Sequence, residues 1–274
     1  MALSPNCLTT LASSVLLCAS GFAQVTQRGN ISSNETQANG TSFNSVLSGD
    51  GRYLAFESVA SNLVPGDTNG ARDIFVRDRL LGTTERLNVD SNGNQSNGND
   101  FWAPVLAISA DGRFVTFTTN ATNLVAGDTN GVPDIFVRDR QLGTMERVSV
   151  DSNGLQANGE SKESSLSRDG RYIAFRSLAS NLVAGDTNGW SDIFVRDQIT
   201  GTTERVSTHT NGTEGDSNNQ NAAISADGRY VAFTSYATTL VATDTNYPYP
   251  DVYLRDRVNN TTERISLGVG GQDP

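Results

Sequence analysis

Three loops of the sequence carry oxygen-bearing side chains at a spacing that could surround a calcium ion. Each loop has Asp at its first position, Asn at its third and Asp at its seventh, and Ca²⁺ prefers carboxylate and amide oxygens. The candidate ligands are Asp67, Asn69, Asp73, Asp128, Asn130, Asp134, Asp186, Asn188 and Asp192. None of the loops has the glycine and the glutamate that complete an EF-hand. The alternative is a structural turn, because Asp and Asn bond their own backbone and Asn-Gly supplies a positive φ.

A second group of charges could be mistaken for the paired carboxylates of a hydrolase. Arg77-Asp78 and Glu85-Arg86 recur in three further places along the chain. A glycosidase needs one pair of carboxyl groups at a defined separation in one pocket, so a set that occurs four times fits ion pairs at hairpins better. We therefore predict no catalytic residue. An enzyme would have to use acids that are not repeated, such as Glu57 or Glu163.

The aromatic residues that break the repeat are the candidate binding residues. They are Trp102, Trp190, Tyr247 and Tyr249. Amphipathic aromatic side chains in loops anchor protein partners and stack against sugars. The alternative is that they cap the edge of the core or fill a seam between structural units.

These residues are positioned by four internal repeats. Asp-Gly-Arg occurs at Asp50, Asp111, Asp169 and Asp227, about 60 residues apart. Each copy is followed at a constant distance by Asp-Thr-Asn, by an apolar run that ends in Arg-Asp, and by Glu-Arg. A period of this length indicates a solenoid, a propeller or an array. The units span about 45–104, 105–162, 163–220 and 221–270.

Each unit reads as four short strands. In the second unit they are expected at about 105–109, 113–118, 134–138 and 144–150, and the runs lack polar alternation, which indicates sheets covered on both faces. Sheets of this kind can stack radially into a β-propeller. We expect an all-β chain with four four-stranded blades in a single ring, with two chains completing a larger ring as the alternative. A match between residues 27–40 and the end of later units predicts one extra N-terminal strand at about 25–33.

The segment Ile224-Ser-Ala-Asp-Gly-Arg-Tyr-Val-Ala-Phe233 resembles the blade signature of TolB-like, WD-type β-propeller repeat proteins of the bacterial envelope and secretome. Asp192-Ile-Phe-Val-Arg-Asp197 followed by Gly201-Thr-Thr203 resembles the outer hairpin of the same blades. The resemblance covers almost all of residues 25–267. It implies a propeller fold and the binding of a protein or ligand by a rigid ring in the cell envelope.

The N-terminus predicts export. Residues 8–19 are apolar, and Gly21-Phe22-Ala23 supplies small residues at a cleavage spacing, so we expect a signal peptide at 1–23 and a mature propeller at 24–274. The mature chain would then be periplasmic or extracellular, without a membrane span. It would also lack cysteine, because Cys7 and Cys18 lie in the leader. A net charge of -10 argues against a nucleic-acid partner.

Three functions follow from this sequence. The first is a noncatalytic scaffold that binds a protein or glycan through rim loops, with no cofactor other than calcium in the acidic loops. The second is a carbohydrate-active propeller enzyme of the glycosidase or lyase kind. The third is a structural envelope module that forms a homo-oligomer through its surplus strand.

Overall fold

The computed structural model describes residues 26–98, 106–242, 244 and 246–268, and all sixteen of its strands lie in four antiparallel sheets. The first sheet consists of β1 (Ser42–Leu47), β2 (Tyr53–Ser58), β3 (Asp73–Asp78) and β4 (Thr83–Arg86), and the second of β5 (Ala107–Ile108), β6 (Phe114–Thr119), β7 (Asp134–Asp139) and β8 (Thr144–Arg147). The third consists of β9 (Ser161–Leu166), β10 (Tyr172–Ser177), β11 (Asp192–Asp197) and β12 (Thr202–Arg205), and the fourth of β13 (Asn219–Ile224), β14 (Tyr230–Ser235), β15 (Asp251–Asp256) and β16 (Thr261–Arg264).

The strands follow one another in chain order within every sheet. This confirms the prediction of an all-β chain with four four-stranded units, and no helix occurs among the described residues. None of these residues therefore belongs to a helix that could cross a membrane. The arrangement follows from the sequence because each Asp-Gly pair closes the hairpin between the first two strands, where Gly112 has a φ of 73°.

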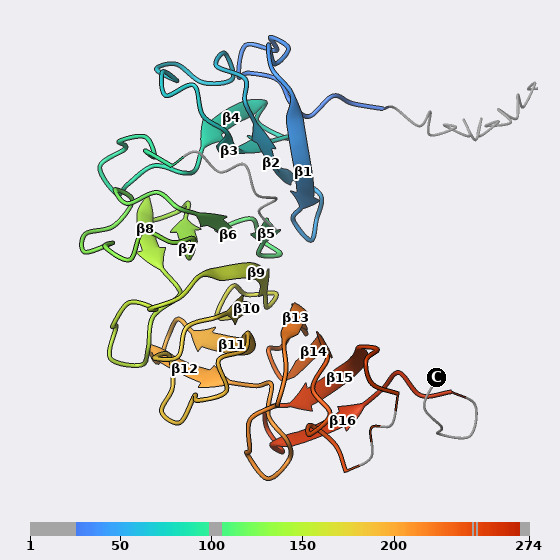
Figure 1. Ribbon diagram of the computed structural model, residues 1–274. Coiled ribbons are helices and arrows are strands. Elements are labelled where there is room, and N and C mark those ends of the chain that lie inside the picture. Colours follow the sequence, from blue (N-terminus) through green and yellow to red (C-terminus); the bar gives the residue numbers. More distant parts are fainter. Residues whose placement is uncertain (1–25, 99–105, 243, 245, 269–274) are drawn as a thin grey trace, which may run out of the picture.

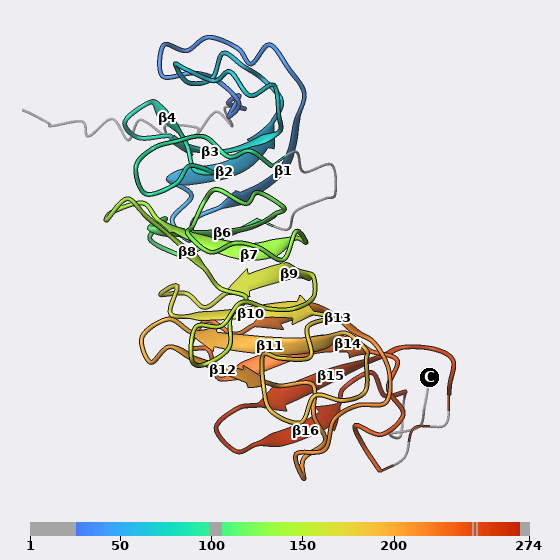
Figure 2. The ribbon, with the colours of Figure 1, turned by 60° about the vertical axis from the view of Figure 1, so that its left-hand side comes forward.

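The four sheets lie face to face in an open row, with β1–β4 at one end and β13–β16 at the other (Figures 1 and 2). The expected ring is not closed by this chain. A four-bladed ring needs a turn of about 90° from each blade to the next. Here the flat faces of neighbouring sheets pack broadly against one another, and the row does not turn far enough for its ends to meet.

The extra N-terminal strand is not confirmed. The described residues 26–30 form no strand, and the segment that follows has only the isolated bridge between Ile31 and Gln37. Equivalent bridges follow the fourth strand of the first three sheets, at Val89–Gln95, Val150–Gln156 and Thr208–Glu214. The segment therefore folds as the loop that follows a fourth strand, but no strand of the described residues pairs with residues 26–30. The predicted leader at 1–23 lies outside the described residues.

The core consists of apolar layers between the sheets, and a stacked pair of aromatic rings marks each sheet. Phe117 and Phe136 have ring centroids 6.2 Å apart, and Phe175 and Phe194 are 5.8 Å apart. Both pairs are fully buried at the interface with the preceding sheet. The corresponding pair of the first sheet, Phe56 and Phe75, packs only with residues of its own sheet and with Ala38 of the N-terminal segment.

We predict that Phe136→Ala lowers the free energy of unfolding by about 3–5 kcal/mol, because it leaves a large cavity in a layer that is closed on both sides. Urea denaturation measures the change. Leu142→Ala is the matched control, since this side chain is 68% exposed in the neighbouring hairpin. Equal effects of the two substitutions would contradict the burial of Phe136.

Candidate functional site

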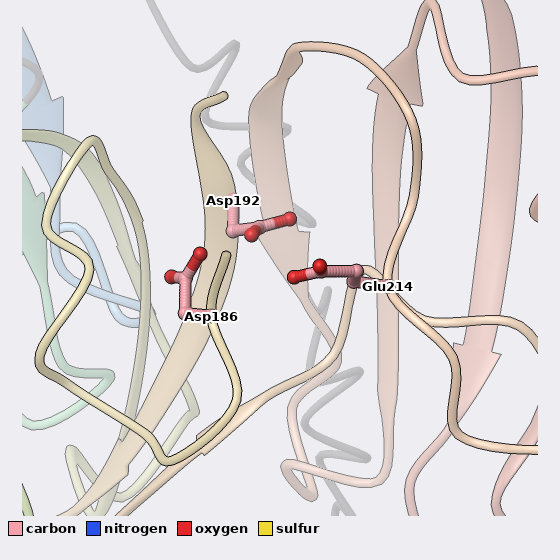
Figure 3. Close-up of side chains that lie close together, drawn as sticks. All are labelled: Asp186, Asp192 and Glu214. Carbon is pink, nitrogen blue, oxygen red and sulfur yellow. The ribbon is translucent and has the colours of Figure 1, made fainter. Parts of the chain in front are cut away.

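The acidic loops that could hold calcium surround an arginine in this structure. In the third sheet, Asp186 and Asp192 come from the loop between β10 and β11 and the start of β11, and Glu214 comes from the loop after β12. Their carboxylates turn toward one another (Figure 3). Nη1 of Arg205 lies 3.5 Å from Asp186, 3.2 Å from Asp192 and 2.8 Å from Glu214. The guanidinium thus stands where a cation would bind.

The same arrangement occurs in every sheet, because the arginine of the repeated Glu-Arg pair points from the fourth strand into the loop. Nη1 of Arg86 lies 3.3 Å from Asp67, and Nη1 of Arg147 lies 3.4 Å from Asp128. The full set of pairs is Arg86 with Asp67 and Asp73, Arg147 with Asp128 and Asp134, Arg205 with Asp186 and Asp192, and Arg264 with Asp244 and Asp251. Each loop therefore contains its own positive charge.

The asparagines at the third loop position act as turn residues. Oδ1 of Asn69 accepts the backbone N–H of Ala71 at 3.1 Å, and Oδ1 of Asn130 accepts that of Val132 at 3.1 Å. Oδ1 of Asn188 accepts the N–H of Trp190 at 2.8 Å. A side-chain oxygen that closes an Asx turn is directed at its own backbone. A calcium ion would have to displace the arginine and draw this oxygen out of the turn.

Burial is the main electrostatic influence on these carboxyl groups. It raises the pKa of Asp192 to about 6, although Ser207 and Arg205 both favour the charged form. Burial, followed by the nearby charge of Asp73, raises the pKa of Asp67 to about 6. Removing a carboxylate from water costs free energy even when a cation lies beside it. Keeping the carboxyl groups of these loops ionised therefore costs free energy, and the positive charge of the arginine offsets that cost.

We predict that the melting temperature of the native protein is the same in millimolar calcium and in EGTA, because the arginines already occupy the acidic loops. Arg205→Ala removes the guanidinium and leaves three carboxylates whose oxygens lie within 4.8 Å of one another, so calcium should raise the melting temperature of this variant. Differential scanning calorimetry checks both. A calcium-dependent shift in the native protein would instead support the nine predicted ligands.

A second set of ion pairs lies at the end of each third strand, away from the acidic loop. Each pair joins the arginine of an Asp-Gly-Arg turn to the aspartate that ends the third strand. Nη2 of Arg52, from the Asp-Gly-Arg turn, lies 2.7 Å from Asp78 at the end of β3. Asp78 also accepts the backbone N–H groups of Leu80 and Leu81. The hydrogen bond from Arg52 lowers the pKa of Asp78 to about 2, against the opposing effect of desolvation. The equivalent pairs are Arg113 with Asp139, Arg171 with Asp197 and Arg229 with Asp256.

A lowered pKa in the folded state means that Asp78 contributes stability above its ordinary pKa of 3.8 and loses it as the pH falls through about 2. We predict that Asp78→Asn is less stable than the native protein at pH 7 and that this difference shrinks between pH 4 and pH 2. Urea unfolding at a series of pH values measures it. A difference that stays constant down to pH 2 would show that the ionised form of Asp78 makes no contribution.

The rim aromatics lie on exposed loops of neighbouring sheets. Trp190 is 45% exposed in the loop between β10 and β11, and Tyr247 and Tyr249 are 68% and 72% exposed in the equivalent loop between β14 and β15. The Asx turn at Asn188 fixes the backbone at Trp190. Trp102 lies outside the described residues. The structure thus places three of the four predicted anchors in two equivalent, adjacent loops.

Glu57 and Glu163, the two examples of nonrepeated acids that an enzyme could use, come from different sheets, and each has an arginine partner. Glu57 is buried 3.2 Å from Nη1 of Arg72, and Glu163 lies 3.5 Å from Nη1 of Arg176. Glu163 also accepts the backbone N–H of Asn221 at 2.9 Å. Within the described residues, Asp186, Asp192 and Glu214 form the one cluster of three potential metal ligands, and it surrounds Arg205.

Sequence reasoning missed a set of contacts between sheets. Arg140 of the second sheet lies 4.3 Å from the ring centroid of Tyr53 in the first, and its Nε lies 2.6 Å from Glu85. The sequence contains a signal for these contacts, because an arginine recurs two positions after the arginine of the Arg-Asp pair in three of the four units. The residues at this position are Arg79, Arg140, Gln198 and Arg257. Only the three-dimensional arrangement shows that this position faces the preceding sheet.

No family model and no curated protein sequence matches this chain. Among solved structures, an oligogalacturonate lyase in complex with manganese is similar at 14% identity and a TM-score of 0.50, over 84% of this chain and 54% of that one. With the four consecutive blades described above, this similarity decides the fold. The chain has a β-propeller fold, with four blades that do not close into a ring.

TolB from Acinetobacter baumannii is similar at 20% identity and a TM-score of 0.47, over 84% of this chain and 44% of TolB. The β-propeller domain of the Trilobed protease from Pyrococcus furiosus is similar at 11% identity and a TM-score of 0.49, over 82% of this chain and 57% of that one. The chain therefore spans about half the length of the propeller structures that it matches. At these identities the similarity concerns the fold alone.

Proposed function

We propose that this TolB-like propeller is an exported, noncatalytic scaffold that binds a protein or glycan partner through the loops of one rim. The observation that carries the proposal is the exposure of Trp190, Tyr247 and Tyr249 in equivalent loops of adjacent blades. Burying large aromatic side chains contributes much of the free energy of binding at protein interfaces, and aromatic rings also stack on sugars. Loops held by a rigid sheet framework lose little entropy when they bind.

The environment of the acids supports the noncatalytic part of the proposal. The repeated aspartates engage arginines in every blade, and the nonrepeated Glu57 and Glu163 each face an arginine. A general acid and a general base need a shared pocket and separate pKa values. The aspartates of the acidic loops, Glu57 and Glu163 instead form ion pairs with arginines.

We predict that Trp190→Ala combined with Tyr247→Ala and Tyr249→Ala weakens binding by roughly tenfold or more, since such anchors commonly contribute over 1 kcal/mol each. Binding would be measured against a panel of immobilised polysaccharides and of envelope protein extracts, which separates the two partner classes. The melting temperature should not change, because the three side chains are exposed.

Leu142→Ala removes an equally exposed apolar side chain from an outer hairpin and is the matched control. Loss of binding in the control as well would show that the rim aromatics have no special role. Turnover of a polysaccharide that depends on Glu57 or Glu163 would overturn the noncatalytic proposal in favour of a carbohydrate-active enzyme.

A further inference from the structure

The contact between the first and second sheets is built from four matched groups. The ring of Tyr53 lies so close to Gly112 of the next sheet that a Cβ there would meet Cδ2 of the ring at 2.1 Å. Arg140, also of the next sheet, lies over the same ring at 4.3 Å and is 2.6 Å from Glu85 of the first sheet. We call this set of tyrosine, glutamate, glycine and arginine the clasp. The preceding sheet supplies its tyrosine and glutamate, and the following sheet its glycine and arginine.

The clasp recurs between the third and fourth sheets. A Cβ on Gly228 would meet Tyr172 at 2.1 Å, and Arg257 lies 4.4 Å from the ring centroid of Tyr172. Nε of Arg257 lies 2.7 Å from Glu204. Between the second and third sheets the aromatic ring and the glycine are present as Phe114 and Gly170, but Gln198 replaces the arginine.

One half of a clasp is unmatched at each end of the row. The first sheet has Gly51 and Arg79, whose Nη1 donates to the carbonyl of Gly51 at 2.6 Å, as Nη1 of Arg140 does to Gly112 at 2.5 Å. The last sheet has Tyr230, with Arg229 stacked 4.8 Å from its ring centroid, and the exposed Glu263. The arginine at one end and the tyrosine and glutamate at the other are therefore already placed as they are in the internal clasps.

The apolar surface around the half-clasps is also uncovered. On the last sheet Val252, Ile265 and Leu267 are 37%, 48% and 46% exposed, while their equivalents on the first sheet, Ile74, Leu87 and Val89, are at most 8% exposed. On the first sheet Leu47 is 52% exposed. It borders a hollow of about 990 Å³ whose lining also includes Leu54, Leu80 and Arg79. Each end of the row thus exposes apolar side chains beside the residues that form a clasp elsewhere in the described chain.

We propose that a second copy of this chain is that neighbour, so that the last sheet of one copy packs head to tail on the first sheet of the other. Arg79 of one copy would lie over Tyr230 and pair with Glu263 of the other. A second copy fits better than another partner because the two half-clasps are complementary in residue type and in charge and belong to the same chain. The clasps within the chain have the geometry that we expect for the contact between the two copies.

The N-terminal segment holds the place of the missing glutamate. Gln27 stands at the repeat position of Glu85, Glu204 and Glu263, and its Oε1 accepts a hydrogen bond from Nη2 of Arg79 at 3.2 Å. A carboxylate binds a guanidinium more strongly than a neutral amide does. Glu263 of a second copy would therefore displace Gln27, and residues 26–30 would move aside as the two sheets meet.

A head-to-tail contact leaves two further half-clasps free, one on each copy. If the geometry closes, two copies form a ring of eight blades, which lies within the range of known propellers; if it does not, copies add into a filament. Both products bury the exposed ends. This association is independent of the rim loops, so it can fail or hold whatever Trp190, Tyr247 and Tyr249 bind.

The test is a charge swap, with mass measured by light scattering and sedimentation over a dilution series of the full chain. We expect the native protein to form dimers or larger species. Arg79→Glu alone and Glu263→Arg alone should each raise the dissociation constant roughly tenfold or more, since each places like charges opposite one another. The double variant should restore association. Both positions are exposed, so the melting temperature reports that each variant folds.

Glu146→Arg is the matched control, because it makes the same charge change at the same repeat position on the second sheet, and the following sheet has Gln198 where a clasp has its arginine. It should leave association unchanged. Gln27→Glu should weaken association by giving Arg79 a carboxylate within its own chain. A native protein that stays monomeric at high concentration would overturn the proposal. So would oligomers that are insensitive to the single reversals, or a double variant that does not reassociate.

Discussion

The burial of both faces of every sheet is the constraint on which the rest of this structure depends. The third strands of the two inner sheets, β7 and β11, have apolar side chains on both faces, and these are almost fully buried. A sheet of this kind is stable only with a neighbour on each side. The stacked rings, the close approach of Gly112 to Tyr53 and the crossing arginines are all consequences of that requirement. The two ends of the row are where it is not met.

The charges of the chain are organised by the same requirement. Between packed sheets, the loops that connect second and third strands are partly buried, and their aspartates lose water. Desolvation raises the pKa of Asp67 and Asp192 to about 6 even with an arginine in contact. Arg86 and Arg205 therefore do locally what a bound cation could do, but they are part of the strand that packs beside the loop. Repetition of the acids then reflects repetition of the blade.

The sequence could predict the units because their signals are local. Asp-Gly pairs specify hairpins, and β-branched and aromatic runs specify strands, so the four strands of the second unit were placed within a few residues of β5 to β8. It could not predict that the row stays open, because the rotation between sheets depends on how whole faces pack. The sequence also could not show that Arg140 contacts Glu85 of another sheet. Aligning the repeats identifies equivalent residues, but it does not show which residues of neighbouring sheets are in contact.

The clasp residues at the two ends of the row differ from those at the middle junction, and this difference supports a role for the ends in association. At the middle junction Gln198 replaces the arginine, and that junction is held by the covalent chain and by a buried apolar layer. The ends of the row are not joined by the chain, yet Arg79, Tyr230 and Glu263 together make the complete charged and aromatic set. Where the backbone already brings two sheets together, the ion pair is dispensable. Where separate molecules must find one another and align, it supplies both attraction and register.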